Sequence, residues 1–118
     1  MGWPRDLPAP EDPEFPQRVV GWLLDRGPAD LRTSPLRSQP VALAYVVQAQ
    51  AEAAVGGARS AYARMRTDLQ QLLDPAALQV AMQALEAEGA RLIQVRREVD
   101  LVLEACLAGR AVGSPDPA

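Results

Sequence analysis

The feature that most constrains this sequence is a pair of long segments with helical periodicity, each opened by a proline. The first begins at Pro40 and the second at Pro75, and neither contains a further proline. Proline is well placed at the first helical position, where the backbone N–H needs no partner within the helix. We predict helices over 40–73 and 75–108, each about 50 Å long. Because the connection at Asp74 is so short, the two helices must fold back antiparallel.

Alternating steps of three and four residues show that the periodicity is that of a coiled coil. From Val41 these steps select ten positions, of which nine are apolar or aromatic and Gln48 is the exception. From Leu78 they select nine positions, of which eight are apolar and Glu88 is the exception. Heptads sustained over this length form a coiled-coil seam. We therefore predict an all-α fold built on a long, coiled-coil-like helical hairpin.

The two seams also match each other in side-chain size. If Leu72 faces Leu78 across the turn, the residue numbers of facing positions add to about 150. Small residues then face larger ones, which lets the helix axes approach closely while each layer stays filled. The pairs are Ala58 with Leu92, Ala51 with Val99, and Ala44 with Cys106.

The same register places polar residues together. Tyr62 falls opposite Glu88, and we expect the phenol and the carboxylate to form a buried polar pair that fixes the register. Glu52 and Arg96 fall on one flank, where we expect an ion pair.

A shorter helix is predicted over 16–26. Phe15, Val19, Trp22 and Leu23 recur at spacings of three and four, and Gly27-Pro28 ends the pattern. Residues 27–39 are rich in turn formers and are interpreted as a loop. Extra apolar residues near 43–47 and 101–107 indicate that this short helix packs at the open base of the hairpin, so that two helices project as an arm.

The ends of the chain differ in composition from this helical domain, which we place over 15–109. Residues 1–14 hold four prolines and four acidic residues, which predicts an extended or disordered tail. Two alternatives remain open for it: a loose tail, or a strap anchored by Trp3 and Leu7. Gly109 suits the end of the last helix, and we expect residues 110–118 to be disordered.

Gly56-Gly57 conflicts with a continuous helix over 40–73. Each glycine disfavours a helix interior by about 1 kcal/mol relative to alanine. We expect the helix to continue, because the heptads run unbroken across the pair. The alternative is a break that yields two shorter helices and a compact four-helix domain.

Composition argues against an enzyme and against a cofactor or metal site. The chain has no histidine, which is the commonest general base and a common metal ligand. Its single cysteine, Cys106, falls on the seam, where we interpret it as a small buried hydrophobic residue. No apolar run is long enough to span a membrane and the N-terminus does not resemble a signal peptide, so we expect a cytoplasmic protein.

The apolar surface of the arm predicts an interaction module. Two helices alone cannot bury all of the large apolar residues on the arm, and such leftover surface commonly meets a second copy or another protein. We expect an antiparallel homodimer with a four-helix-bundle core, and another protein as a further partner. The candidate partner-binding residues are Arg59, Arg66, Val80, Met82 and Ile93.

The arginines carry the alternative function. All 12 basic residues are arginine, and Arg59 and Arg66 lie seven residues apart on one flank. A basic stripe could recognise phosphates in a nucleic-acid-associated accessory protein. The net charge of −3 disfavours this alternative. A third interpretation is a lid or subunit of an enzyme assembled with another chain.

Overall fold

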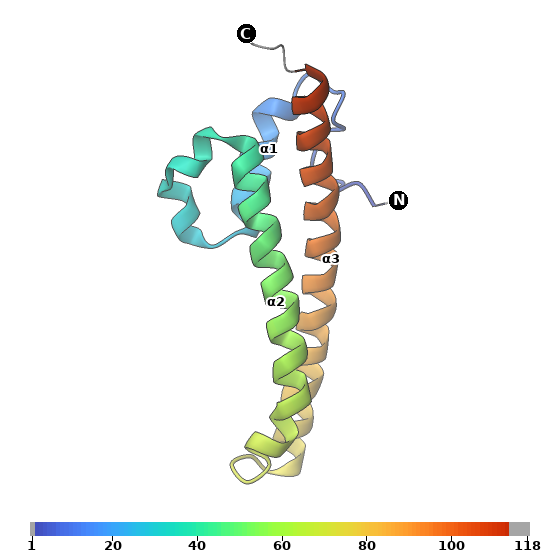
Figure 1. Ribbon diagram of the computed structural model, residues 1–118. Helices are drawn as coiled ribbons and strands as arrows, with labels where there is room; N and C mark the ends of the chain where they lie inside the picture. The colour runs from blue at the N-terminus through green and yellow to red at the C-terminus, as the bar shows by residue number, and fades with distance from the viewer. Residues whose placement is uncertain (1, 114–118) are drawn as a thin grey trace.

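The computed structural model describes residues 2–113, and the side chains of residues 2–109 (Figure 1). Over these residues it is all-helical, as predicted, and contains no strand. Two long helices form an antiparallel hairpin, and the short first helix packs at its base. The elements are α1 (Phe15–Arg26), the 3₁₀ helices η1 (Ala29–Thr33) and η2 (Pro35–Ser38), α2 (Pro40–Leu69) and α3 (Pro75–Gly113).

The turn of the hairpin is longer than predicted. Helix α2 ends at Leu69, and the backbone N–H groups of Leu72 and Leu73 both bond to the Leu69 carbonyl. Asp74 caps α3 as expected, because its carboxylate accepts a hydrogen bond of 2.7 Å from the backbone N–H of Ala77. Leu72 therefore lies in the turn and is exposed, and the predicted layer of Leu72 against Leu78 is wrong.

Helix α3 extends to Gly113, so the predicted end at Gly109 is also wrong. A glycine ends a helix most effectively when it adopts a positive φ, and no described glycine does so. Residues 110–113 thus belong to the helix, not to a tail, and residues 114–118 lie outside the described residues.

Helix α2 is continuous through Gly56-Gly57, which excludes the broken alternative. The heptad pattern on either side keeps one seam facing α3, and tertiary packing of this kind commonly overrides helix propensity. The result is a molecule 63 Å long, with extents of 30 and 20 Å in the other two directions.

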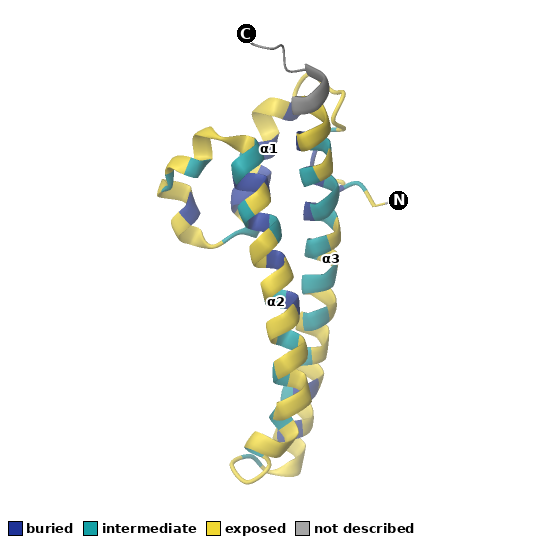
Figure 2. Cartoon of the chain, viewed as in Figure 1, coloured by how far each residue is buried: buried dark blue, intermediate teal, exposed yellow. Residues whose placement is uncertain are grey.

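The main core lies at the base, where all three helices meet. Figure 2 shows most of the buried residues gathered there, while the arm is largely half-buried or exposed. Leu23 of α1, Leu43 of α2 and Val102 of α3 are each fully buried in one cluster. Burying a leucine or valine side chain contributes about 1.5–3 kcal/mol, so this cluster dominates the stability of the domain.

The segment before α1 is a strap that packs on the base, and the prediction of a loose tail is wrong. Leu7 is buried in the core cluster, and Trp3 packs against it at its edge. The Trp3 indole N–H donates to the Leu7 carbonyl at 3.0 Å, and the ring lies 6.1 Å from that of Phe15. Proline restricts the unfolded segment, so that less entropy is lost when the strap becomes ordered.

Asp6 fastens the strap to α1. Its carboxylate accepts hydrogen bonds of 2.8 Å from the Trp22 indole and 2.8 Å from the Arg26 guanidinium. Arg26 also lies over the Trp22 ring, 3.9 Å from its centroid. The hydrogen bond from Trp22, followed by that from Arg26, lowers the pKa of the Asp6 carboxyl below its usual value.

We predict that D6N lowers the free energy of unfolding by about 1 kcal/mol at neutral pH, because two charge-assisted hydrogen bonds to a partly exposed carboxylate are weakened. A carboxyl with a lowered folded-state pKa stabilises the fold above its unfolded pKa, near 3.8, and loses that contribution as the pH falls through the folded-state pKa. Urea unfolding should therefore show the difference between D6N and wild type shrinking below that range. D30N, at another exposed carboxylate, should match the wild type; equal stability of D6N and D30N would contradict the role of Asp6.

Glycine-to-alanine substitutions at two positions should have opposite effects. A Cβ at Gly57 meets no atom within 4 Å, so G57A should raise the free energy of unfolding by about 1 kcal/mol through helix propensity. A Cβ at Gly27 would lie 2.8 Å from Leu31 Cδ1 and 3.3 Å from Val47 Cγ2, so G27A should lower it by about 1 kcal/mol. Thermal unfolding measures both; destabilisation by G57A would show that α2 does not continue through this pair.

Candidate interaction surfaces

One face of the hairpin, here called the open face, is left uncovered by α1 and the strap. Its stripe on α2 follows steps of three and four residues, and its stripe on α3 does so from Glu86 to Asp100, with Leu107 seven residues further on. Two pairs join the stripes near the base: Gln48 donates to Asp100 at 3.0 Å, and Arg96 lies 3.9 Å from Glu52. The predicted ion pair between Glu52 and Arg96 is thus confirmed. The open face comprises Tyr45, Gln48, Glu52, Val55, Arg59 and Tyr62 of α2 with Glu86, Gly89, Ile93, Arg96, Asp100 and Leu107 of α3.

The packing of α1 and the strap explains why this face is open. Gly27, at the end of α1, approaches α2 at Val47 and Gln50, which lie off the stripe. The strap passes beside Leu101 of α3, which also lies off the stripe. As a consequence, large apolar side chains of the open face stay in contact with solvent: Tyr45 is 64% exposed and Leu107 is 48% exposed.

A groove of about 390 Å³ lies at the centre of the open face. Small residues line its middle, because Ala58 and Gly89 leave space between the two helices. Larger residues, Tyr62 and Ile93 among them, line it on either side. The complete lining is Val55, Ala58, Arg59, Tyr62, Leu85, Glu86, Gly89, Ala90 and Ile93.

Two charges of opposite sign flank this groove, Arg59 on α2 and Glu86 on α3. Both side chains are exposed, and within the described part of the chain neither forms an ion pair within 4.0 Å. An apolar groove with one positive and one negative side can bind a surface that carries the same two charges in reversed positions.

The candidate partner-binding residues are only partly brought together. Arg59 and Ile93 line the groove, and Arg66 is exposed one heptad beyond Arg59. Val80 is 66% exposed but lies nearer the turn, away from the groove. Met82 is 5% exposed, so its place among the partner-binding residues is wrong: it packs inside the hairpin, where its flexible side chain fills space between the helices.

Tyr62 and Glu88 do not form the predicted buried pair. Tyr62 is 41% exposed on the groove, and Glu88 is exposed on another side of α3. Arg91 holds Glu88 through hydrogen bonds of 2.7 and 3.0 Å and lowers the pKa of the Glu88 carboxyl. The free energy of a carboxylate is far lower in water beside an arginine than inside an apolar seam. Helix α3 therefore presents Gly89 to α2 in place of Glu88.

Six residues of the groove were not among the candidates predicted from the sequence: Val55, Ala58 and Leu85, which the heptads assign to the seam, and Glu86, Gly89 and Ala90. The sequence does contain a signal for Gly89 at the seam, because this residue directly follows Glu88, the one heptad position of the second helix that is not apolar. A strict repeat of 3.5 residues selects Glu88, whereas a helix with 3.6 residues per turn drifts toward the next position.

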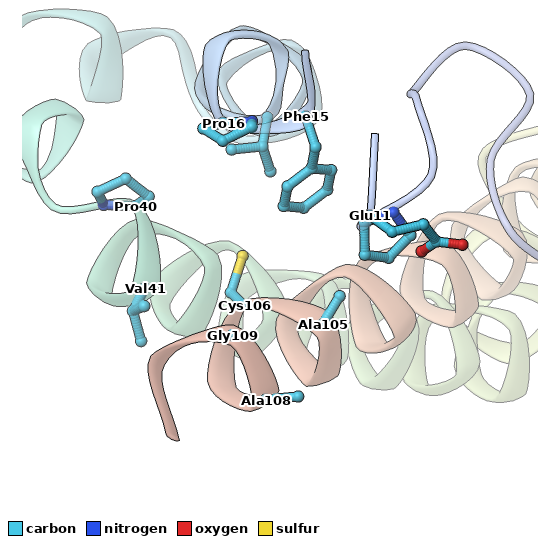
Figure 3. A pocket seen from close by; sticks show the side chains of 11 residues that line it. Glu11, Phe15, Pro16, Pro40, Val41, Ala105, Cys106, Ala108 and Gly109 are labelled. Carbon is cyan, nitrogen blue, oxygen red and sulfur yellow. The ribbon is translucent and has the colours of Figure 1, made fainter. Parts of the chain in front are cut away.

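A second groove, of about 660 Å³, lies at the base between the start of α1, the start of α2 and the end of α3. Figure 3 shows the Cys106 sulfur pointing toward Phe15 and Pro16 in this space. The other labelled side chains are apolar except that of Glu11. Cys106 is 9% exposed, and burial raises the pKa of its thiol.

Among the described residues, no cluster of three or more histidine, cysteine or carboxylate side chains is arranged to hold a metal ion. None of the described helices combines the length and apolar character needed to cross a membrane.

Half of the six arginines of α2 and α3 whose side chains are described form ion pairs. Arg64 lies 3.8 Å from Asp68, Arg91 lies 2.7 Å from Glu88, and Arg96 lies 3.9 Å from Glu52. The arginines left unpaired among the described residues of the arm are Arg59, Arg66 and Arg97.

No protein-family model, no curated protein and no solved structure matches this chain.

Burial should make Cys106 a slow nucleophile in the folded protein. Because its pKa is raised and access is restricted, we expect the reaction with an aromatic disulfide reagent at pH 8 to be at least about tenfold slower than in denaturant. The release of chromophore measures both rates. Equal rates in the folded and unfolded protein would contradict a buried thiol.

Proposed function

We propose that this protein is a non-enzymatic helical interaction module that acts as a homodimer through the open face. The observation that carries the proposal is the groove between α2 and α3, which is lined mainly by apolar residues and flanked by Arg59 and Glu86. In a monomer this apolar surface would remain exposed to water. Pairing with a second copy removes apolar side chains from water and gives each of the two charges a partner.

The exposed apolar residues support a partner on this particular face. Three of the five exposed large apolar residues in the described chain, Tyr45, Tyr62 and Leu107, lie on the open face, while the two most exposed, Leu72 and Val80, lie near the turn. Aromatic residues are enriched at the centres of protein interfaces, because they bury much area with little loss of side-chain entropy. A dimer through this face would complete a four-helix core along the arm.

The base groove and the turn lie outside the open face, so we propose that they are the surfaces available to a different protein. The base groove is apolar, and Leu72 and Val80 near the turn are both strongly exposed. We further propose a cytoplasmic location. The arginines give little support to nucleic-acid binding, because half of those described on α2 and α3 are already paired with acidic residues.

A pair of matched substitutions tests the proposal. Ala90 lines the groove, whereas Ala84 lies on another side of the same helix, and both side chains are exposed. A90E and A84E each add a carboxylate four residues from an existing one, Glu86 and Glu88 respectively, so their intrinsic effects on the helix are alike. We expect wild type and A84E to be dimers at micromolar concentration and A90E to be a monomer.

Light scattering after size exclusion measures the mass of each variant, and circular dichroism verifies that both remain helical. A wild-type protein that stays monomeric at micromolar concentration would overturn the homodimer. Dimers that persist in A90E would move the interface away from this groove.

A further inference from the structure

We propose that the two copies associate through their open faces while pointing in the same direction, so that α2 of one copy lies against α3 of the other. Arg59 of each copy then pairs with Glu86 of the second copy. This inference rests on the proposed homodimer and adds its orientation and its specific contacts. It differs from the antiparallel assembly expected from the sequence.

The charges of the open face carry the inference. At two levels along the hairpin both helices carry a charge beside the seam, and at these two levels α2 and α3 bear opposite signs. Glu52 on α2 lies 3.9 Å from Arg96 on α3. Further along, Arg59 on α2 and Glu86 on α3 line the same groove. The sign on each helix therefore reverses between the two levels, and at both levels it is opposite to the sign on the neighbouring helix.

A two-fold axis parallel to the arm matches this pattern at every level. Such an axis brings α2 of one copy opposite α3 of the other at the same height, so each of these four charges meets the opposite sign. The four helices then surround the axis in the order α2, α3, α2, α3. At the level of Glu52 and Arg96 their charges therefore alternate between negative and positive. Arg59 and Glu86, which form no ion pair among the described residues, obtain one in the second copy.

A two-fold axis across the arm does not match it, because each helix then faces its own copy. If the axis passes near Tyr62, Arg59 comes opposite Arg66 of the second copy. If it passes near Val55, Arg59 meets Glu52 of the second copy, but Glu86 is brought within a turn of the second copy's Asp100. Either arrangement places like charges together, which costs association free energy.

Shape complementarity points to the same orientation. With the copies parallel, Tyr62 on α2 lies at the height of Gly89 and Ala90 of the second copy's α3. An aromatic side chain then enters the part of the groove where small residues leave space. The symmetry repeats this contact, so that two tyrosines fill two halves of one interface.

Charge reversal tests the contact between Arg59 and Glu86. We expect R59E and E86R each to raise the dimer Kd about tenfold, because each homodimer then faces like charges. An equimolar mixture of the two variants should restore wild-type affinity, since one copy carries two acidic and the other two basic side chains. R64E, on another side of α2, should leave the Kd unchanged. Sedimentation velocity measures each Kd; a wild-type dimer whose Kd is unaffected by R59E and E86R overturns the inference.

The orientation is measured separately, with a spin label at the turn. In C106A/Q71C a single label sits on each exposed turn. In parallel copies the turns lie about one helix spacing apart, roughly 10 Å before the label arms are added. In antiparallel copies, Gln71 lies about 14 Å from an axis near Tyr62 or about 24 Å from one near Val55, so the turns are about 27 or about 48 Å apart.

Pulsed electron paramagnetic resonance on dimers that carry both labels reports this distance. A short distance supports the inference, and a distance of about 27 Å or more overturns the orientation while leaving the homodimer intact. A protein that is monomeric at every concentration overturns the homodimer itself, so the two failures are distinguishable.

Discussion

Close approach of α2 and α3 is the constraint on which the rest of the structure depends. Helix α2 presents alanine at Ala44 and Ala51, both buried, where α3 supplies larger residues such as Val99. Small residues allow the axes to approach and let a seam only one or two side chains wide be buried. Because the seam residues are small, they leave little side-chain volume to cover the flanks of the hairpin. A hairpin packed in this way is narrow and exposes apolar residues on either side of its seam.

The apolar flanks of the hairpin are covered at the base but not along the arm. At the base, α1 and the strap cover one flank, and Trp22, Asp6 and Arg26 fasten them through short polar contacts at the edge of the core. The arm has no such cover, and its flank shows a groove in place of a packed layer. No third helix covers this flank of the described arm, and the uncovered groove is the physical reason for proposing a second copy.

Those features of the fold that depend on local sequence rules could be predicted from the sequence. Proline at the starts of α1, α2 and α3, the Asp74 cap and the heptads gave the helices and their pairing. The sequence could not show where solvation of a side chain outweighs the local helical pattern. Strict heptad steps placed Glu88 in the seam, but hydration and Arg91 held that carboxylate outside. Composition left a loose tail and an anchored strap both open, and one buried leucine with three bonded polar groups orders the segment as a strap. The groove could not be read from either helix alone, because it depends on how far apart two facing segments lie.

Glycine within the long helices bears on the assembled state. Gly57 and Gly89 each disfavour the helix by about 1 kcal/mol, and a Cβ at either position would meet nothing within 4 Å. The single chain thus offers no packing reason for either glycine, which is a conflict between local preference and fold. Gly57 lies off the open face. For Gly89, in the middle of the groove, a side chain from a second copy would occupy the space that a Cβ would otherwise fill, so an interface accounts for the glycine where the monomer does not.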